Sequence, residues 1–89
     1  MNSKQRKTLA AIFEKPTRKN IPWNDIESLF LGIGAEIANK GGSVVTIKMG
    51  GKPQTFHRPH PQKEAPAYCV NNVRRFLLEH GVNNEYNEI

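Results

Sequence analysis

The stretch SVVTIKMGGKPQTFH, residues 43–57, decides the fold of this chain. Two runs rich in β-branched and aromatic residues flank Gly50 and Gly51. Two glycines between strand-like runs are typical of a β-hairpin with a two-residue turn. If these glycines form the turn, the strands pair in one register, which a bulge would shift. The expected facing pairs are Met49–Lys52, Ile47–Gln54, Val45–Phe56 and Val44–His57.

The two faces of this hairpin differ in chemistry, because side chains alternate between faces along a strand. One face is apolar and consists of Val45, Ile47, Met49 and Phe56. The other is largely polar and consists of Val44, Thr46, Lys48, Pro53, Thr55 and His57. We expect the apolar face to cover a core and the polar face to stay open, with a histidine on it.

Segments on both sides of the hairpin predict helices. Upstream, apolar residues follow the period of a helix at Ile26, Leu29, Phe30 and Ile33. Downstream, residues 67–82 show the same period at Val70, Val73 and Leu77. Residues 3–15 predict a shorter amphipathic helix, with Ser3 as its N-cap. Residues 35–40 fit a short strand before the hairpin.

The predicted order of elements is therefore α-α-β-β-β-α. It favours an α+β fold in which helices pack on one face of a three-stranded antiparallel sheet and the other face is free. At 89 residues the chain fits a single domain, residues 1–89. We expect residues 83–89, which contain few apolar side chains, to be a frayed tail.

The charge of the chain favours a polyanionic partner. Its net charge is +5, and no acidic residue lies between Ile37 and Lys63. Basic balance in a small domain points to nucleic acid. A solvated basic surface with no such partner is the alternative.

Other features argue against a secreted, membrane or metal-binding protein. Cys69 is the single cysteine, so it forms no internal disulfide, and its helical setting favours a small buried side chain over a nucleophile. The first ten residues lack the apolar region of a signal peptide, and no apolar stretch could span a membrane. His57, His60, Cys69 and His80 match no common zinc spacing. We expect a cytoplasmic protein without a metal or small-molecule cofactor.

Two short motifs, GGSVV at residues 41–45 and HPQKE at residues 60–64, lie in an order of elements that resembles the HicA toxins. The likeness covers roughly residues 21–82, and residues 3–19 resemble an N-terminal extension found in a longer branch of that family. The resemblance implies a double-stranded-RNA-binding-domain-like fold. It also implies an mRNA interferase that is neutralised by a HicB-like antitoxin.

One position departs from the family pattern. HicA toxins usually read Gly-Ser-His, and the resemblance implies that this histidine cleaves RNA. Here the triplet is Gly42-Ser43-Val44, and valine cannot transfer a proton. The expected register places His57 opposite Val44, so an imidazole on the neighbouring strand could occupy nearly the same space.

RNA cleavage without a metal needs a base, an acid and cations around the phosphate. Histidine can serve as base or acid near neutral pH. We therefore take His57 as the candidate base, and His60 as either the acid or a loop-structuring residue. Candidate RNA-contacting residues are Lys40, Ser43, Lys48, Lys52, Arg58 and Lys63. Two alternatives stay open: a non-catalytic RNA-binding module on the same fold, and a protein-binding domain whose basic face meets an acidic partner.

Some further residues have a structural and a functional interpretation. Trp23 and Tyr68 could stack on bases, but each adjoins an expected helix start and fits a packing role. Thr46 and Thr55 could bind phosphate or 2′-hydroxyl groups, but threonine is also common in strands. His80 would complement the dipole at a helix C-terminus, which is a structural role.

Overall fold

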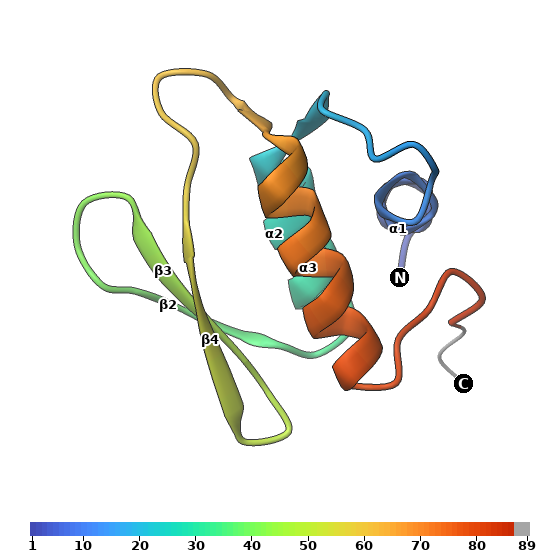
Figure 1. The fold of residues 1–89 in the computed structure, drawn as a ribbon. Helices are drawn as coiled ribbons and strands as arrows, with labels where there is room; N and C mark the ends of the chain where they lie inside the picture. Colours follow the sequence, from blue (N-terminus) through green and yellow to red (C-terminus); the bar gives the residue numbers. More distant parts are fainter. Residues whose placement is uncertain (87–89) are drawn as a thin grey trace.

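The computed structural model describes residues 1–86, which fold into three helices and two small antiparallel sheets (Figure 1). The helices are α1 (Ser3–Ile12), α2 (Trp23–Gly32) and α3 (Ala67–Glu79). The strands are β1 (Ile21–Pro22), β2 (Glu36–Asn39), β3 (Val44–Met49), β4 (Lys52–His57) and β5 (Glu64–Ala65). The predicted α+β class and element order are confirmed, and β1 and β5 are additions that the sequence did not predict.

The three-stranded sheet has the strand order β2-β3-β4 and is antiparallel throughout. Gly50 and Gly51 form the β3–β4 turn, with φ of 57° and 83°, a backbone region that favours glycine. All four predicted facing pairs are confirmed, from Met49–Lys52 at the turn to Val44–His57 at the open end.

The hydrogen-bonding pattern of this hairpin explains how β4 accommodates a proline. The Arg58 N–H donates to the Ser43 carbonyl at 2.7 Å, one pair beyond the end of the ladder. Hydrogen-bonded and non-hydrogen-bonded pairs alternate in an antiparallel ladder, so Lys48–Pro53 falls at a non-hydrogen-bonded position. Pro53 also lies on an edge strand, where its missing N–H leaves no partner unsatisfied.

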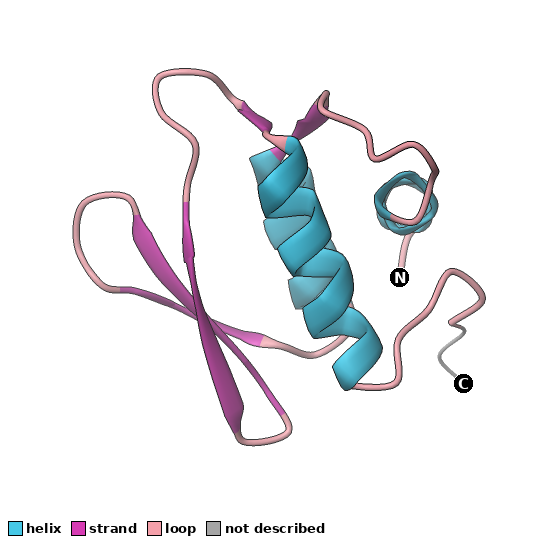
Figure 2. Ribbon diagram, in the orientation of Figure 1, coloured by secondary structure: helices cyan, strands magenta, loops and turns pink. Residues whose placement is uncertain are grey.

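The helices lie on one side of the three-stranded sheet, as Figure 2 shows, and the other face of the sheet is uncovered. α1 packs against α2 and α3, on the side away from that sheet (Figure 1). The hydrophobic core draws on the three helices and the β3–β4 hairpin, with Leu9 and Ile12 from α1, Phe30 from α2, Val45 from β3 and Phe76 from α3. Met49, at the hairpin end, is only partly buried, whereas the other apolar-face residues are buried.

Phe56 connects the hairpin to the helices. Its ring is buried, with centroids 6.0 Å from Trp23, 6.2 Å from Phe30 and 5.9 Å from Phe76. Aromatic pairs at these separations add to the free energy gained by burial. Because Phe56 is fixed in the core, its neighbour His57 must project from the opposite, uncovered face.

The start of α1 corrects one sequence prediction. Asn2, rather than Ser3, is the N-cap: its side-chain oxygen accepts the Gln5 N–H at 2.8 Å, and the Gln5 side chain accepts the Asn2 N–H at 2.9 Å. This reciprocal capping box needs a Gln or Glu three residues after the cap, and Gln5 meets that requirement only for Asn2.

The end of the described chain lies against the core. Residues 83–86 form a turn closed by the Tyr86 N–H and the Asn83 carbonyl at 3.0 Å, and Tyr86 packs against the core cluster. Residues 87–89, the remainder of the tail expected to fray, lie outside the described residues.

β1 and β5 tie together the chain segments that enter α2 and α3. Ile21 pairs with Ala65 and Pro22 with Glu64, and the Trp23 N–H donates to the Lys63 carbonyl at 2.9 Å. The starts of the two core helices are thereby held side by side. No helix in the described part of the chain combines the length and apolar character that crossing a membrane requires.

Candidate nucleic-acid interface

His57 lies on the uncovered face of the sheet, at the end of β4. Its side chain is exposed, and it faces the half-buried Val44 on β3. Since Ser43 and Arg58 form the neighbouring hydrogen-bonded pair, Val44 and His57 are a non-hydrogen-bonded pair. Facing Cα atoms in such pairs are about 4.5 Å apart and their side chains are close. An imidazole at either position would therefore reach the same part of this face.

A surface hollow lies at the same end of the hairpin. It brings together Ser43, Arg58 and His60, which the sequence marked as candidate site residues, with Gly42 and Pro59 between them. His60 is exposed and comes from the loop that follows β4. His57 does not line this hollow, although the chain places it directly beside Arg58. The two candidate histidines thus flank Arg58 in sequence and lie at one end of the sheet.

A second depression lies along the open face of the sheet. Lys40, Thr46, Lys48 and Thr55 line it, and the Thr46 and Thr55 hydroxyls lie 3.5 Å apart. Glu36 also lines it, and in the register of β2 and β3 Glu36 lies opposite Lys48. The open face therefore presents two lysines and two hydroxyls, with one carboxylate at its edge.

Arg58 is held by contacts that the sequence interpretation missed. Its Nε donates to Glu27 Oε2 at 2.7 Å, its Nη2 lies 3.4 Å from Glu27 Oε1, and Nη2 also donates to Asn39. Hydrogen bonding to Glu27 raises the pKa of Arg58, with a smaller contribution from the charge attraction between them. Within residues 1–86 the Nη1 group makes no hydrogen bond. The guanidinium is therefore fixed in position with one nitrogen still available.

Glu27 has a second partner on its own helix. The Trp23 indole N–H donates to Glu27 Oε2, the oxygen that also accepts from Arg58. Trp23 is buried, so its packing role is confirmed, and its ring is not available to stack on a base. No local sequence signal links Glu27 to Arg58, since the two residues are 31 positions apart.

Two candidate phosphate contacts, Lys52 and Lys63, line neither of these two depressions. Lys52 faces Met49 at the turn and therefore extends from the side of the sheet that faces the helices, where it lines a depression with Glu79 and His80. Lys63 is exposed beside β5. The structure thus groups Lys40 with Lys48, and Ser43 with Arg58 and His60, and leaves Lys52 and Lys63 apart.

Two of the remaining residues with possible chemistry, Cys69 and His80, have structural roles. Cys69 is buried, and burial raises the pKa of its thiol to about 11, so it is protonated near neutral pH and a weak nucleophile. The His80 ring packs on Phe76 with centroids 4.5 Å apart, and its Nδ1 lies 2.8 Å from the Phe76 carbonyl. Tyr68, by contrast, is 66% exposed. Within residues 1–86, no three His, Cys, Asp or Glu side chains cluster as metal ligands would.

The comparisons with known proteins identify the family. The model of the HicA toxin of bacterial toxin–antitoxin systems matches residues 23–80. This chain belongs to the HicA toxin family. The matched range runs from the first residue of α2 to just beyond α3, so it contains the whole three-stranded sheet and both candidate histidines, and α1 precedes it. Searches of curated proteins and of solved structures gave no significant match.

Proposed function

We propose that this HicA-family toxin binds mRNA on the uncovered face of its sheet and cleaves it, with His57 as general base. The observation that carries the proposal is the position of His57 directly opposite Val44, where the family usually has a histidine. In this chain the imidazole would come from β4 instead of β3. It would nevertheless meet the substrate at the same place.

The cleavage needs no metal. His57 removes the proton of a ribose 2′-hydroxyl, and that oxygen attacks the adjacent phosphorus. The bond from phosphorus to the 5′-oxygen breaks, and this leaving oxygen takes a proton from an acid, for which His60 is the candidate. The products are a 2′,3′-cyclic phosphate and a free 5′-hydroxyl.

Arg58 and Lys48 supply the positive charge that the phosphate needs in the transition state. Arg58 suits this role because Glu27 and Asn39 hold its guanidinium and leave Nη1 without a partner within residues 1–86. A cation that is already in position costs little reorganisation when charge develops on the phosphate. Lys40 and Lys48 would contact neighbouring phosphates along the open face.

A HicB-like antitoxin would neutralise this activity, and both proteins would act in the cytoplasm, where mRNA is found. The second candidate function is a non-catalytic RNA-binding module. The valine at position 44 favours it, because loss of the usual histidine can also mean loss of cleavage.

The test is controlled expression of the wild type and three single variants. We expect the wild type to arrest growth and degrade mRNA. His57→Ala should do neither while still binding RNA, and His60→Ala should cleave about 10²–10⁴-fold more slowly if His60 is the acid. Gln54→Ala, on the same strand but on the opposite face of the sheet, is the matched control and should remain toxic. Toxicity of His57→Ala equal to that of the wild type would contradict the proposal, and RNA binding without cleavage by the wild type would favour the module.

A further inference from the structure

The positive charge of this chain is concentrated outside the matched family region. Residues 1–22 contain six of the 13 lysines and arginines and one of the eight acidic residues, a net charge of +5. Residues 23–80 contain seven lysines and arginines against five acids, a net charge of +2. The segment that precedes the family match therefore carries a charge equal to that of the whole chain.

These cations lie far from the open face of the sheet. α1 and the loop after it stand on the far side of α2 and α3 from the three-stranded sheet (Figure 1). The molecule therefore has a second basic region, which we call the N-terminal basic surface. It consists of Lys4, Arg6, Lys7, Lys15, Arg18 and Lys19.

Three of these side chains have no partner in the described part of the chain. Lys7, Lys15 and Lys19 are exposed, and within residues 1–86 their ammonium groups make no hydrogen bond or ion pair. Two others are engaged: Lys4 with Asp25 at 3.5 Å, and Arg18 with Glu14 at 3.0 Å. The unpartnered lysines are the ones that are free to meet an external anion.

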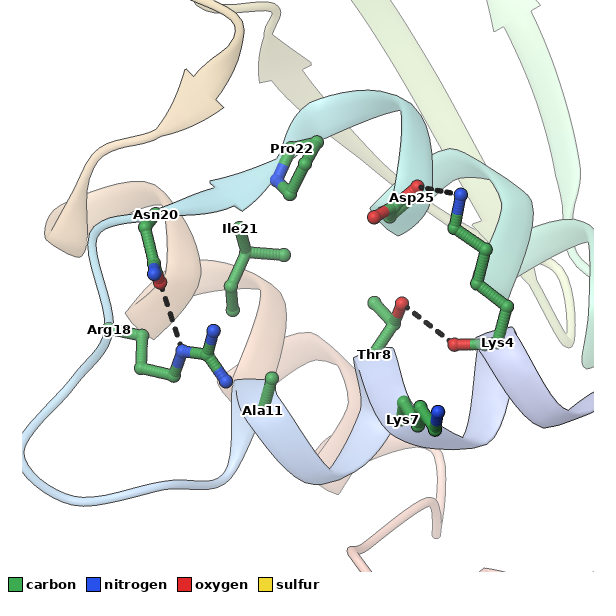
Figure 3. Close-up of a pocket in the computed structure, with 9 residues that line it drawn as sticks. All are labelled: Lys4, Lys7, Thr8, Ala11, Arg18, Asn20, Ile21, Pro22 and Asp25. Atoms are coloured by element: carbon green, nitrogen blue, oxygen red, sulfur yellow. Dashed lines mark hydrogen bonds and ion pairs between the residues drawn. The ribbon is translucent and has the colours of Figure 1, made fainter.

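A hollow of about 340 Å³ lies within this surface, between α1 and the start of α2 (Figure 3). Lys4, Lys7 and Arg18 line it, together with Thr8 of α1 and the backbone region around Pro22. Asp25 is its one carboxylate, and Figure 3 shows the Lys4 ammonium directed toward it. Cations outnumber carboxylates three to one at its rim.

The chemistry of this surface fits a phosphate backbone better than a protein partner. The exposed large apolar side chains of residues 1–86 are Leu31, Tyr68 and Leu78, and none belongs to residues 1–22. Protein interfaces depend on buried apolar or aromatic anchors at their centre. Contacts to nucleic-acid phosphates need only positioned cations and polar groups.

We propose that the N-terminal basic surface is a second RNA-binding surface, which contacts backbone phosphates of an RNA whose other part lies on the open face of the sheet. This inference rests on the proposed function of the open face. Because the two surfaces lie on different sides of the molecule, a short RNA occupies only one of them. A longer RNA occupies both and gains affinity through effective concentration.

The test is a variant with Lys7→Gln, Lys15→Gln and Lys19→Gln in the full chain. Its matched control carries Lys7→Arg, Lys15→Arg and Lys19→Arg, which keep the charge. Both also carry His57→Ala to prevent cleavage. Binding to single-stranded RNAs of about 6 and about 30 nucleotides is measured by fluorescence anisotropy over a series of salt concentrations.

For the longer RNA we expect the Gln variant to bind about tenfold to 100-fold more weakly near 0.1 M salt. The slope of log K against log salt should become shallower by about 2, because three phosphate contacts are lost. The Arg control should match the parent, and the short RNA should show a smaller effect.

An unchanged slope for the longer RNA would overturn the inference. So would a Gln variant that binds RNA like the parent but loses affinity for an acidic antitoxin, since the surface would then serve a protein partner. Cleavage by the His57→Ala parent during these titrations would count against the proposed base alone. The two proposals can therefore fail separately.

Discussion

His57 on β4 and Val44 on β3 face each other as a non-hydrogen-bonded pair at the open end of the hairpin. In such a pair the two side chains emerge close together from one face of the sheet. An imidazole at position 57 therefore reaches nearly the same part of the open face as an imidazole at position 44 would reach. Under the proposed function, His57 supplies the imidazole that Val44 cannot.

Replacing Glu27 tests whether the Trp23–Glu27–Arg58 contacts stabilise the fold. Glu27→Ala removes the acceptor of a buried indole N–H and the partner of Arg58. We expect the free energy of unfolding, measured by urea denaturation, to fall by about 1–3 kcal/mol. Glu14→Ala is the control, because its ion pair with Arg18 is more exposed and should contribute less than about 1 kcal/mol. Equal losses in the two variants would show that Glu27 has no special role.

Shortening Phe56 tests the packing that directs His57 outward. Phe56→Ala removes a buried ring that contacts three other aromatic residues, and we expect a loss of about 3–5 kcal/mol in the free energy of unfolding. Thr55→Ala, one residue earlier and exposed, should change it by less than about 0.5 kcal/mol. Thermal unfolding followed by circular dichroism measures both. A stable Phe56→Ala variant would mean that β4 is held mainly by its backbone.

The raised pKa of Cys69 predicts a loss of stability at alkaline pH. The thiol ionises near pH 9 in the unfolded chain and near 11 in the folded one. Between these values the unfolded state binds fewer protons, so the free energy of unfolding falls as pH rises. The full loss is on the order of 2–3 kcal/mol. Cys69→Ala should lack this component. Urea denaturation of both proteins between about pH 8 and about pH 11 measures the difference, because the unfolded-state thiol ionises within that range. A constant difference across that range would contradict the prediction.

Local sequence signals were sufficient for the main elements of the fold. The two glycines at the turn set the hairpin register, and the apolar period located α2 and α3, because these features depend on neighbouring residues. The same alternation that placed His57 on the open face also places Lys52 on the opposite face, so its separation from Lys48 could have been predicted.

Contacts between distant segments could not be predicted in this way. β1 and β5 are two residues each and have no periodic signal, and their pairing depends on how the chain enters α2 and α3. The ion pair of Arg58 with Glu27 likewise joins β4 to α2 only after the helix has packed on the sheet. The sequence therefore indicated the type of residue at the candidate site, and the structure was needed to show which cation is fixed and which cations are free.

The most direct test of the proposed catalytic role is to move the imidazole back across the hairpin. RNA cleavage rates are measured for the wild type, for His57→Val, and for the double variant His57→Val with Val44→His. We predict that His57→Val loses cleavage by about 10²–10⁴-fold and that the double variant recovers much of it. Full cleavage by His57→Val, or a double variant no more active than His57→Val, would contradict the claim that His57 supplies the function of the missing histidine.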